Sequence, residues 1–312
     1  MMNLKSANIV VFGGINMDLI GLATRLPLPG ETVQGESFYT SPGGKGANQA
    51  VAAARLGGTV KMFGRVGNDL FGQDLIRNLS ENQVNVDGIA RDKNNSSGIA
   101  MILLDSTRQN HILAIYGANL SCNEEQIKAL ESTLEETDVL LLQSEIPVDI
   151  SLAAARAAKN REVLVIWDPA PPSKIPTEAY EFIDILTPNQ SEAEFLTGIP
   201  VNDVASADTA ASVLLEFGTK TAVIKMGDLG TYYASQYRRD HVMPYKVIAV
   251  DSIAAGDAFG GALAVALAKD NPIDQAIKFG AAAGALAVTK KGAQTAMPSL
   301  KEVKSLMSSS KT

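Results

Sequence analysis

The sequence contains very little cysteine and histidine, two residue types that commonly bind metals or act in nucleophilic catalysis. It has one cysteine, Cys122, and two histidines, His111 and His241. A single cysteine excludes an intramolecular disulfide and any multi-cysteine metal site, and it is typical of a reducing compartment such as the cytoplasm. There is no HExxH motif, and neither histidine lies in a recognisable nucleophile motif. Hydrolase chemistry therefore has little support in the sequence.

An excess of basic residues and a long apolar segment are also missing. Lys and Arg number 27 against 34 for Asp and Glu, the formal net charge is −7, and no cluster of basic residues stands out. We therefore expect no nucleic-acid partner. No apolar run approaches the roughly 18 residues of a membrane helix, and the first run is interrupted by Gly13, Gly14 and Asp18. This predicts a cytoplasmic protein without a membrane partner, whose first apolar run is a strand and not a signal peptide.

Two common glycine-rich phosphate-binding motifs are absent as well. In the segment GGKGAN, residues 43–48, a glycine occupies the position where a P-loop has Ser or Thr after its lysine. No GxGxxG motif follows the first predicted strand. A nucleotide would therefore have to bind through a different arrangement.

What the sequence does contain is an alternation of buried strands and helices. With 46% hydrophobic residues, a chain of 312 residues can bury a large core. Runs that are β-branched or leucine-rich and lack polar alternation predict strands buried on both faces, at residues 8–14, 138–143, 163–169, 184–189 and 221–227. Helical patterns lie between them, at residues 47–56, 70–82, 124–134, 150–159 and 205–217. We predict an α/β fold, with helices flanking a doubly wound, mostly parallel sheet in a single domain over residues 1–312.

Two regions interrupt this rhythm, at residues 19–40 and 98–116. Both alternate apolar and polar residues, which predicts antiparallel strands with one exposed face. In the second region the segments GIAMILLD and NHILAIY are separated by a predicted turn, STRQ, at residues 106–109. We expect a small antiparallel β lid that stands off the main sheet. The alternative is an antiparallel extension at the edge of the main sheet.

Two predicted helix starts combine small residues with polar ones. In DSIAAGDAF, residues 251–259, Asp257 follows a small-residue turn, and it could either cap the helix or lie beside a phosphate bound by the same amides. In the segment at residues 41–58, Lys45 and Asn48 precede an alanine-rich helix, and they could lie in a solvated turn or bind a ligand. In a doubly wound sheet, such helix starts cluster at the carboxyl ends of the strands. One start could therefore hold an alcohol and the other a phosphate chain.

Six ordered segments together resemble the ribokinase branch of the ribokinase-like, or PfkB, carbohydrate kinases. They are GGINMD, LPLPGETV, GGKGANQAVAAARLG, TPNQSEAEFLTG, DSIAAGDAF and VTKKGAQ, which begin at residues 13, 26, 43, 187, 251 and 288. The resemblance spans nearly the whole chain. The wider family has Gly-Ala-Gly-Asp where this sequence has Ala254-Ala255-Gly256-Asp257, a departure that looks like the ribokinase branch.

The resemblance implies an ATP-dependent phosphorylation of D-ribose at O5, with Mg²⁺. Asp257 would be the general base, and the amides of Ala254, Ala255, Gly256 and Asp257 would form an anion hole for the transferring phosphoryl group. The remaining residues would bind the sugar hydroxyls or, from the lid, cover its apolar face. The first group is Asn16, Asp18, Gly44, Lys45, Asn48 and Glu145, and the lid residues are Ala100 and Ile112.

For the nucleotide, the resemblance implies Asn189 at the phosphates of ATP and Glu192 near magnesium, through water. The same two residues have the spacing of a capping box, N-x-x-E, which is the structural alternative. The resemblance also implies that Lys225, Gly227, Asp228 and Gly230, together with Gly256, lie along the nucleotide.

A potassium ion (K⁺) and a homodimer are further implications of the resemblance. The ion would be surrounded by oxygens of Asp251, Ile253, Val288, Lys291, Ala293 and Met297, and the dimer would form through the lid. Three alternatives for function stay open. The first two are a kinase for 2-deoxyribose and one for a nucleoside or another furanose, because small pocket changes separate these sugars. The third is a sugar or nucleotide sensor without catalysis.

Overall fold

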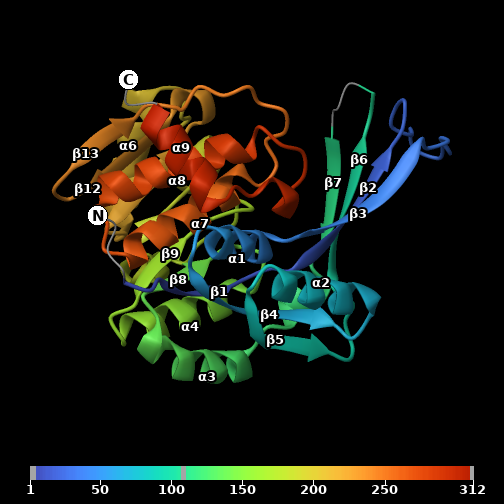
Figure 1. Ribbon diagram of the computed structural model, residues 1–312, viewed down its shortest axis with the longest axis horizontal. Helices are drawn as coiled ribbons and strands as arrows, with labels where there is room; N and C mark the ends of the chain where they lie inside the picture. Colours follow the sequence, from blue (N-terminus) through green and yellow to red (C-terminus); the bar gives the residue numbers. More distant parts are fainter. Residues whose placement is uncertain (1–4, 107–109, 310–312) are drawn as a thin grey trace.

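The computed structural model describes residues 5–106 and 110–309, and within them the chain forms two β-sheets (Figure 1). The larger sheet has nine strands in the order β13-β12-β11-β10-β9-β8-β1-β4-β5. Its bounds are β1 Asn8–Phe12, β4 Thr59–Gly67, β5 Asn85–Asp92, β8 Val139–Leu142, β9 Leu164–Trp167, β10 Ile185–Leu186, β11 Thr221–Lys225, β12 Thr231–Ser235 and β13 Arg239–Val242. All pairs from β11 to β5 are parallel, whereas β12 and β13 form an antiparallel edge. The predicted doubly wound, mostly parallel sheet is confirmed.

Helices cover both faces of this sheet. The first face carries α1 Lys45–Arg55, α2 Leu70–Glu81, α7 Ala255–Ala268, α8 Ile273–Ala287 and α9 Leu300–Ser309, which share one hydrophobic core. The second face carries α3 Glu124–Thr133, α4 Val148–Lys159, α5 Gln190–Thr197 and α6 Val204–Phe217, which share another. In Figure 1, α1, α7 and α8 lie above the central strands β1, β8 and β9, and α3 and α4 lie below them. Among the described helices, none combines the length and the apolar character needed to cross a membrane.

The smaller sheet stands apart from the larger one and is not an extension of its edge (Figure 1). Its order is β3-β2-β6-β7, with bounds β2 Asn16–Leu22, β3 Ser37–Gly43, β6 Gly98–Leu104 and β7 Asn110–Ile115. The two outer pairs are antiparallel, as predicted, but the central pair β2–β6 is parallel, and the connection between these strands runs through β3 and then through α1, β4, α2 and β5. Apart from Ser106, the predicted turn at residues 106–109 lies outside the described residues.

Close packing of α1 against α7 fixes the relative position of the two helix starts that the sequence singled out. A Cβ atom on Gly261 would lie 2.7 Å from the Cβ of Ala52 and 2.8 Å from the carbonyl oxygen of Gln49. Only glycine allows this approach. Elsewhere along the contact, the small alanine side chains of both helices keep the two helices close together. The starts of α1 and α7 therefore lie near each other at the carboxyl ends of the parallel strands, where a doubly wound sheet binds its ligands.

Candidate active site

A polar cluster lies where β2 begins and β8 ends. The side-chain amide of Asn16 donates to Oε1 of Glu145 over 3.3 Å, and the backbone N–H of Lys45 donates to Oε2 of the same carboxylate over 2.7 Å. Gly44 allows this approach, because it has φ 88° and a Cβ there would lie 2.6 Å from the backbone nitrogen of Asn16. The start of α1 is thereby joined to the smaller sheet and to the end of β8.

Burial raises the pKa of the acids in this cluster. The pKa of Asp18 rises to about 7, mainly because burial disfavours its charged form and secondly because Asp257 is negative. The pKa of Glu145 also rises to about 7, again mainly through burial, although the Lys45 ammonium and the Lys45 N–H oppose the rise. The pKa of Lys45 rises as well: burial lowers it, but the combined attraction of Asp257, Asp168, Glu145 and Glu192 outweighs that effect. Lys45 is thus a common positive partner of Glu145, Asp168, Asp257 and Glu192.

Asp257 lies in the first turn of α7 and is only 4% exposed. It does not act as the helix cap, because the cap position is Ala254, at φ 59°, and no side chain caps the helix. Instead, the Asp257 carboxylate accepts from Nδ2 of Asn48 over 2.9 Å and from Nε2 of Gln49 over 3.4 Å. Burial raises the pKa of Asp257, with Lys45 opposing the rise. A buried carboxylate beside an uncapped helix start is suited to act as a base next to an anion.

Asn48 has one free acceptor beside this carboxylate. Its Nδ2 is used by Asp257, while its Oδ1 is buried and has no hydrogen-bond partner within the described part of the chain. A buried unsatisfied oxygen is costly unless a ligand or water donates to it. A hydroxyl group of a sugar has the donor that Oδ1 lacks.

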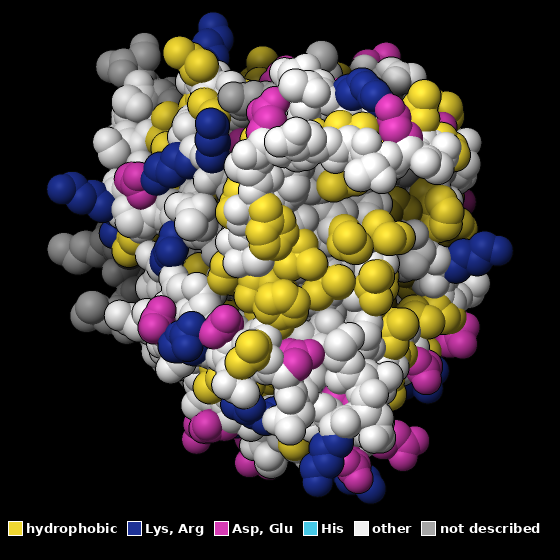
Figure 2. Space-filling view, turned by 90° about the vertical axis from the view of Figure 1, so that its right-hand side faces the viewer, with side chains coloured by type: hydrophobic (Ala, Val, Ile, Leu, Met, Phe, Trp, Pro, Cys, Tyr) yellow, Lys and Arg dark blue, Asp and Glu magenta, His cyan; other side chains and the backbone are white. Residues whose placement is uncertain are grey.

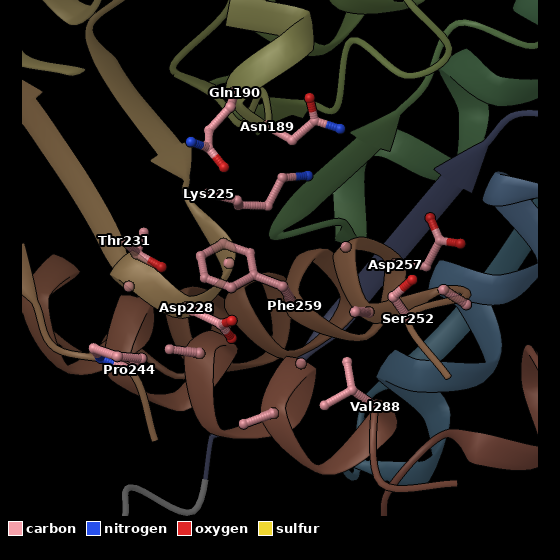
Figure 3. A pocket seen from close by; sticks show the side chains of 18 of the residues that line it. Asn189, Gln190, Lys225, Asp228, Thr231, Pro244, Ser252, Asp257, Phe259 and Val288 are labelled. Carbon is pink, nitrogen blue, oxygen red and sulfur yellow. The ribbon is translucent and has the colours of Figure 1, made fainter. Parts of the chain in front are cut away.

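A cavity of about 840 Å³ opens beside Asp257 (Figure 3). It is lined by the first turn of α7 and by predicted nucleotide residues, namely Asn189, Glu192, Lys225, Gly227, Asp228, Gly230 and Gly256. Figure 3 shows Lys225 extending from its strand toward the side of the cavity where Asn189 and Asp257 lie. Nζ of Lys225 lies 3.2 Å from the place that a Cβ on Gly256 would take. The cavity therefore has a cation close to the amides at the start of α7.

The capping box predicted as the alternative for Asn189 and Glu192 is present. Oδ1 of Asn189 accepts from the Glu192 N–H over 2.9 Å, and Oε2 of Glu192 accepts from the Asn189 N–H over 2.7 Å. Burial also raises the pKa of Glu192. Both residues line the cavity, so the capping role and the predicted nucleotide role involve the same place, and the second stays a prediction.

The loop around Asp251 is braced by hydrogen bonds. The Asp251 carboxylate accepts from the N–H groups of Ile253 and Gly292, each over 3.0 Å, and the Val288 carbonyl accepts from the N–H groups of Val250 and Asp251. Three other oxygens predicted for potassium also accept: those of Lys291, Ala293 and Met297, from Thr295, Ala296 and Arg55. A carbonyl oxygen that accepts one hydrogen bond still has a lone pair for a cation, but the Val288 oxygen already accepts two hydrogen bonds and has none left. The bracing role of Asp251 is present, and this arrangement would fit a cation only if the Val288 bonds were exchanged.

The two predicted lid residues have different environments. Ala100 lies opposite Asp18 in the β2–β6 register, so the two side chains share one face of the smaller sheet. Ile112 lies opposite Ile102, further along the same face, and is 58% exposed. The structure thus places Ala100 beside the polar cluster and Ile112 farther from it.

Three buried polar residues of the site were missed from the sequence. Asp168 and Gln143 directly follow β9 and β8, and Gln49 lies in the alanine-rich part of α1. Asp168 forms an ion pair with Lys225 at 2.8 Å, and Gln49 donates to Asp168 over 3.0 Å. A polar residue immediately after a fully buried strand was the available signal for Asp168 and Gln143. For Gln49 the available signal was its place directly after Asn48 in the segment GGKGANQAVAAARLG.

The chain belongs to the pfkB family of carbohydrate kinases, whose model matches residues 6–300. It is 37% identical to a ribokinase of Haemophilus influenzae, over 94% of this chain and 96% of the relative. It is 33% identical to a deoxyribokinase of Salmonella typhi, over 96% and 99%. A structure of Arabidopsis thaliana ribokinase complexed with ribose and ATP is 32% identical and superimposes with a TM-score of 0.89, covering 97% of this chain and 99% of that one.

We expect the buried Asp18 carboxylate to lower stability at neutral and higher pH. Its pKa is about 7 in the folded state against 3.8 ordinarily, so the folded protein retains a proton that the unfolded chain loses as the pH rises through this window. The free energy of unfolding therefore falls as the pH rises from about 4 to 7. Asp18→Asn, which cannot ionise, should raise the free energy of unfolding at about pH 8 by roughly 1 to 3 kcal/mol.

Urea unfolding at about pH 5 and pH 8 measures this difference. The gain of Asp18→Asn should shrink toward the lower pH, because the wild-type carboxyl is then protonated in the folded state. Asp87→Asn, at an exposed position of β5, is the matched control and should leave stability nearly unchanged at both values. An equal gain for Asp18→Asn at both pH values would show that its charge is not destabilising.

Proposed function

We propose that this protein transfers the γ-phosphoryl group of ATP to the O5 hydroxyl of D-ribose, giving D-ribose 5-phosphate. The observation that carries the proposal is the place of Asp257, buried between the polar cluster at β2 and the cavity at the start of α7. The two ribokinase relatives support ribose and ATP as the substrates. Retention of a buried base between two sites argues against a sensor, which needs no base.

The polar cluster supplies the groups that bind a polyol. Carboxylates accept from hydroxyl groups, amide groups both donate and accept, and a sugar presents adjacent hydroxyls to both. We assign sugar binding to Asn16, Asp18, Gly44, Lys45, Asn48 and Glu145, with Ala100 and Ile112 on the smaller sheet. The free Oδ1 of Asn48 would accept from the hydroxyl nearest Asp257.

Asp257 would take the proton of the O5 hydroxyl as O5 bonds to the γ-phosphorus. The bond from that phosphorus to the bridging oxygen breaks, and ADP leaves with both bonding electrons. Burial favours this role, because it raises the pKa of Asp257 and makes the carboxylate a better proton acceptor. The amides of Ala254, Ala255, Gly256 and Asp257 would face the charge on the transferring group.

Lys225 and Asn189 would bind the phosphate chain, with Gly227, Asp228 and Gly230 along the rest of the nucleotide. Bound magnesium supplies positive charge that neutralises the phosphates. Glu192 fits a role through water, because it is a buried oxygen ligand at the cavity whose two oxygens already accept from Asn189. The described residues contain no group of three or more His, Cys, Asp or Glu arranged for a metal. Phosphate and water oxygens would therefore be the main ligands, as magnesium prefers.

The other proposed properties concern compartment and partners. The acidic net charge of −7 supports the absence of a nucleic-acid partner, and the single, buried Cys122 supports a reducing compartment such as the cytoplasm. We retain the assignment of residues 1–312 to a single domain as a proposal.

The central prediction concerns Asp257. Asp257→Asn keeps the shape and the contact with Asn48 but removes the base, so kcat for ribose should fall by about 10² to 10⁴-fold with little change in stability. A coupled assay of ADP release measures kcat, and urea unfolding measures stability. Asp149→Asn, at an acid in the first turn of α4, is the matched control and should keep normal kcat. A near-normal kcat for Asp257→Asn would refute the base assignment.

The same assay separates the alternative substrates. Ribose, 2-deoxyribose, other pentoses, hexoses and nucleosides are compared by kcat/KM, and ribose should be the best of them. The deoxyribokinase relative makes 2-deoxyribose the main competitor. A higher kcat/KM for 2-deoxyribose than for ribose would identify 2-deoxyribose as the substrate. Sugar or nucleotide binding without ADP release, for every sugar tested, would favour a sensor.

We also propose activation by potassium, supported by the family resemblance; ion binding at the loop around Asp251 would require the Val288 carbonyl to exchange its two hydrogen bonds. In buffer whose cations are magnesium and a bulky organic amine, adding potassium should raise kcat several-fold, and sodium should be a poorer substitute. Asp251→Ala should abolish this response while ribose affinity, measured by calorimetry, stays nearly unchanged. Full activity without an alkali cation would limit Asp251 to bracing its loop.

A homodimer through the smaller sheet is the remaining proposal. Apolar side chains are exposed on its strands, namely Phe38, Tyr39, Met101, Leu103, Ile112, Leu113 and Ile115. Figure 2, which views the side of the molecule that carries this sheet, has hydrophobic side chains gathered near its centre. An exposed apolar surface of this kind is typical of an interface. Light scattering at micromolar concentration should give twice the monomer mass, and a monomer at every concentration would refute the dimer.

A further inference from the structure

Gln49 is a fully buried glutamine in the first half of α1, one residue after Asn48. Its side-chain nitrogen lies 3.0 Å from Oδ2 of Asp168 and 3.4 Å from Oδ1 of Asp257. Its side-chain oxygen accepts from Nε2 of Gln143 over 2.6 Å. One amide group therefore contacts the carboxylate at the start of α7, the carboxylate after β9 and the amide after β8.

The chemistry of these partners determines the orientation of the Gln49 amide. Ionised carboxylates only accept, so the two N–H groups of Gln49 must face Asp168 and Asp257, one each. The Gln143 amide donates to the remaining oxygen, which prevents the opposite orientation. Gln143 is itself fully buried, and its amide oxygen lies close against Gly13 at the end of β1. The hydrogen bond from Gln143 thus fixes the oxygen end of the Gln49 amide, and the N–H groups at the other end point toward Asp168 and Asp257.

Several charged groups face Asp257 from the elements packed around it. They are Lys45 at the start of α1, Lys225 on β11, Asp168 after β9, Asp18 on β2 and Glu145 after β8. Asp168 is paired with Lys225 at 2.8 Å, so Gln49 links the proposed base to the ion pair on the nucleotide side. Because Gln49 is neutral, it donates to both acids without adding a charge of its own. Hydrogen bonds of this kind favour the ionised form of a carboxyl.

We propose that Gln49 is a positioning residue that fixes the orientation of the Asp257 carboxylate, favours its ionised form and ties it to the Asp168–Lys225 pair. Gln143 anchors Gln49 in this role. The inference rests on the proposed function, in which Asp257 is the base, and it assigns Gln49 no contact with the sugar or the nucleotide. Gln49 acts through Asp257, so its loss changes the ionisation of Asp257 as well as the rate.

The test replaces the glutamine by an unbranched apolar residue of similar size. Gln49→Met should lower kcat by about 10 to 100-fold, while KM for the sugar changes less than kcat. The low-pH limb of the kcat profile should move upward by about 0.5 to 1 pH unit, because the ionised carboxylate has lost a donor. Gln126→Met is the matched control: Gln126 is a buried glutamine of α3, on the opposite face of the larger sheet from α1, and it donates to the Gly64 carbonyl. It should lower stability without moving the pH profile.

Gln143→Met tests the same chain of contacts one step further from Asp257. It should move the profile in the same direction by a smaller amount, and its effect should largely disappear when Gln49 is already Met, because Gln143 acts through Gln49. An unchanged pH profile for a folded Gln49→Met would overturn the inference. Fully additive effects of the two substitutions would also overturn it.

A carboxyl ¹³C titration by NMR separates this inference from the proposed function. The Asp257 signal, assigned by its absence in Asp257→Asn, should titrate at higher pH in Gln49→Met or, if that variant does not fold, in Gln143→Met. An inactive wild-type protein would refute the proposed function, and the titration would still decide the influence of Gln49 on Asp257. An Asp257 titration that is the same in wild type and variant would refute the inference even in an active kinase.

Discussion

The contact between α1 and α7 is the constraint on which the site depends. Both helices are built from small residues, and Gly261 lies so close to Ala52 and Gln49 that no larger residue fits without displacement. Because the helices approach this closely, Asn48 and Gln49 of α1 reach the Asp257 carboxylate of α7, although some 208 residues separate them in sequence. Interiors packed to this density transmit small shifts directly, so the packing of these two helices sets the position of the Asp257 carboxylate.

The electrostatics of the site follow from that arrangement. Asp18, Glu145, Asp168, Asp257 and Glu192 share a small volume with the cations Lys45 and Lys225. Burial and mutual repulsion raise the pKa of Asp18, Glu145, Asp257 and Glu192. For Glu145, Asp257 and Glu192, nearby lysines and hydrogen-bond donors oppose the rise. Such a concentration of buried acids lowers the free energy of unfolding near neutral pH. Clusters of acids with shifted pKa values are typical of functional sites, and these residues are suited to bind a polyol and a phosphate chain. The cations lie toward the cavity and the neutral amide donors lie behind the acids.

The sequence predicted the layers of the fold because buried parallel strands form unbroken apolar runs, and because the helices between them have clear periodicity. It did not predict the parallel β2–β6 pair, since that contact joins segments separated in sequence by β3, α1, β4, α2 and β5. Asp257 and Asn48 could be singled out because each lies in a recognisable motif at a predicted helix start. Gln49 was missed although it directly follows Asn48 in the same segment, because its partners Asp168 and Gln143 come from distant strands. Contacts of this type are determined by topology and not by local pattern.

The central claim is that one carboxylate, Asp257, lies between a sugar and a nucleotide that approach from opposite sides. A crystal structure with ribose and a non-hydrolysable ATP analogue tests this directly. The account predicts the O5 hydroxyl within about 3 Å of the Asp257 carboxylate, the other hydroxyls against Asn16, Asp18 and Glu145, and the terminal phosphate at the first turn of α7. Ribose bound with another hydroxyl facing Asp257, or a terminal phosphate away from the start of α7, would contradict it.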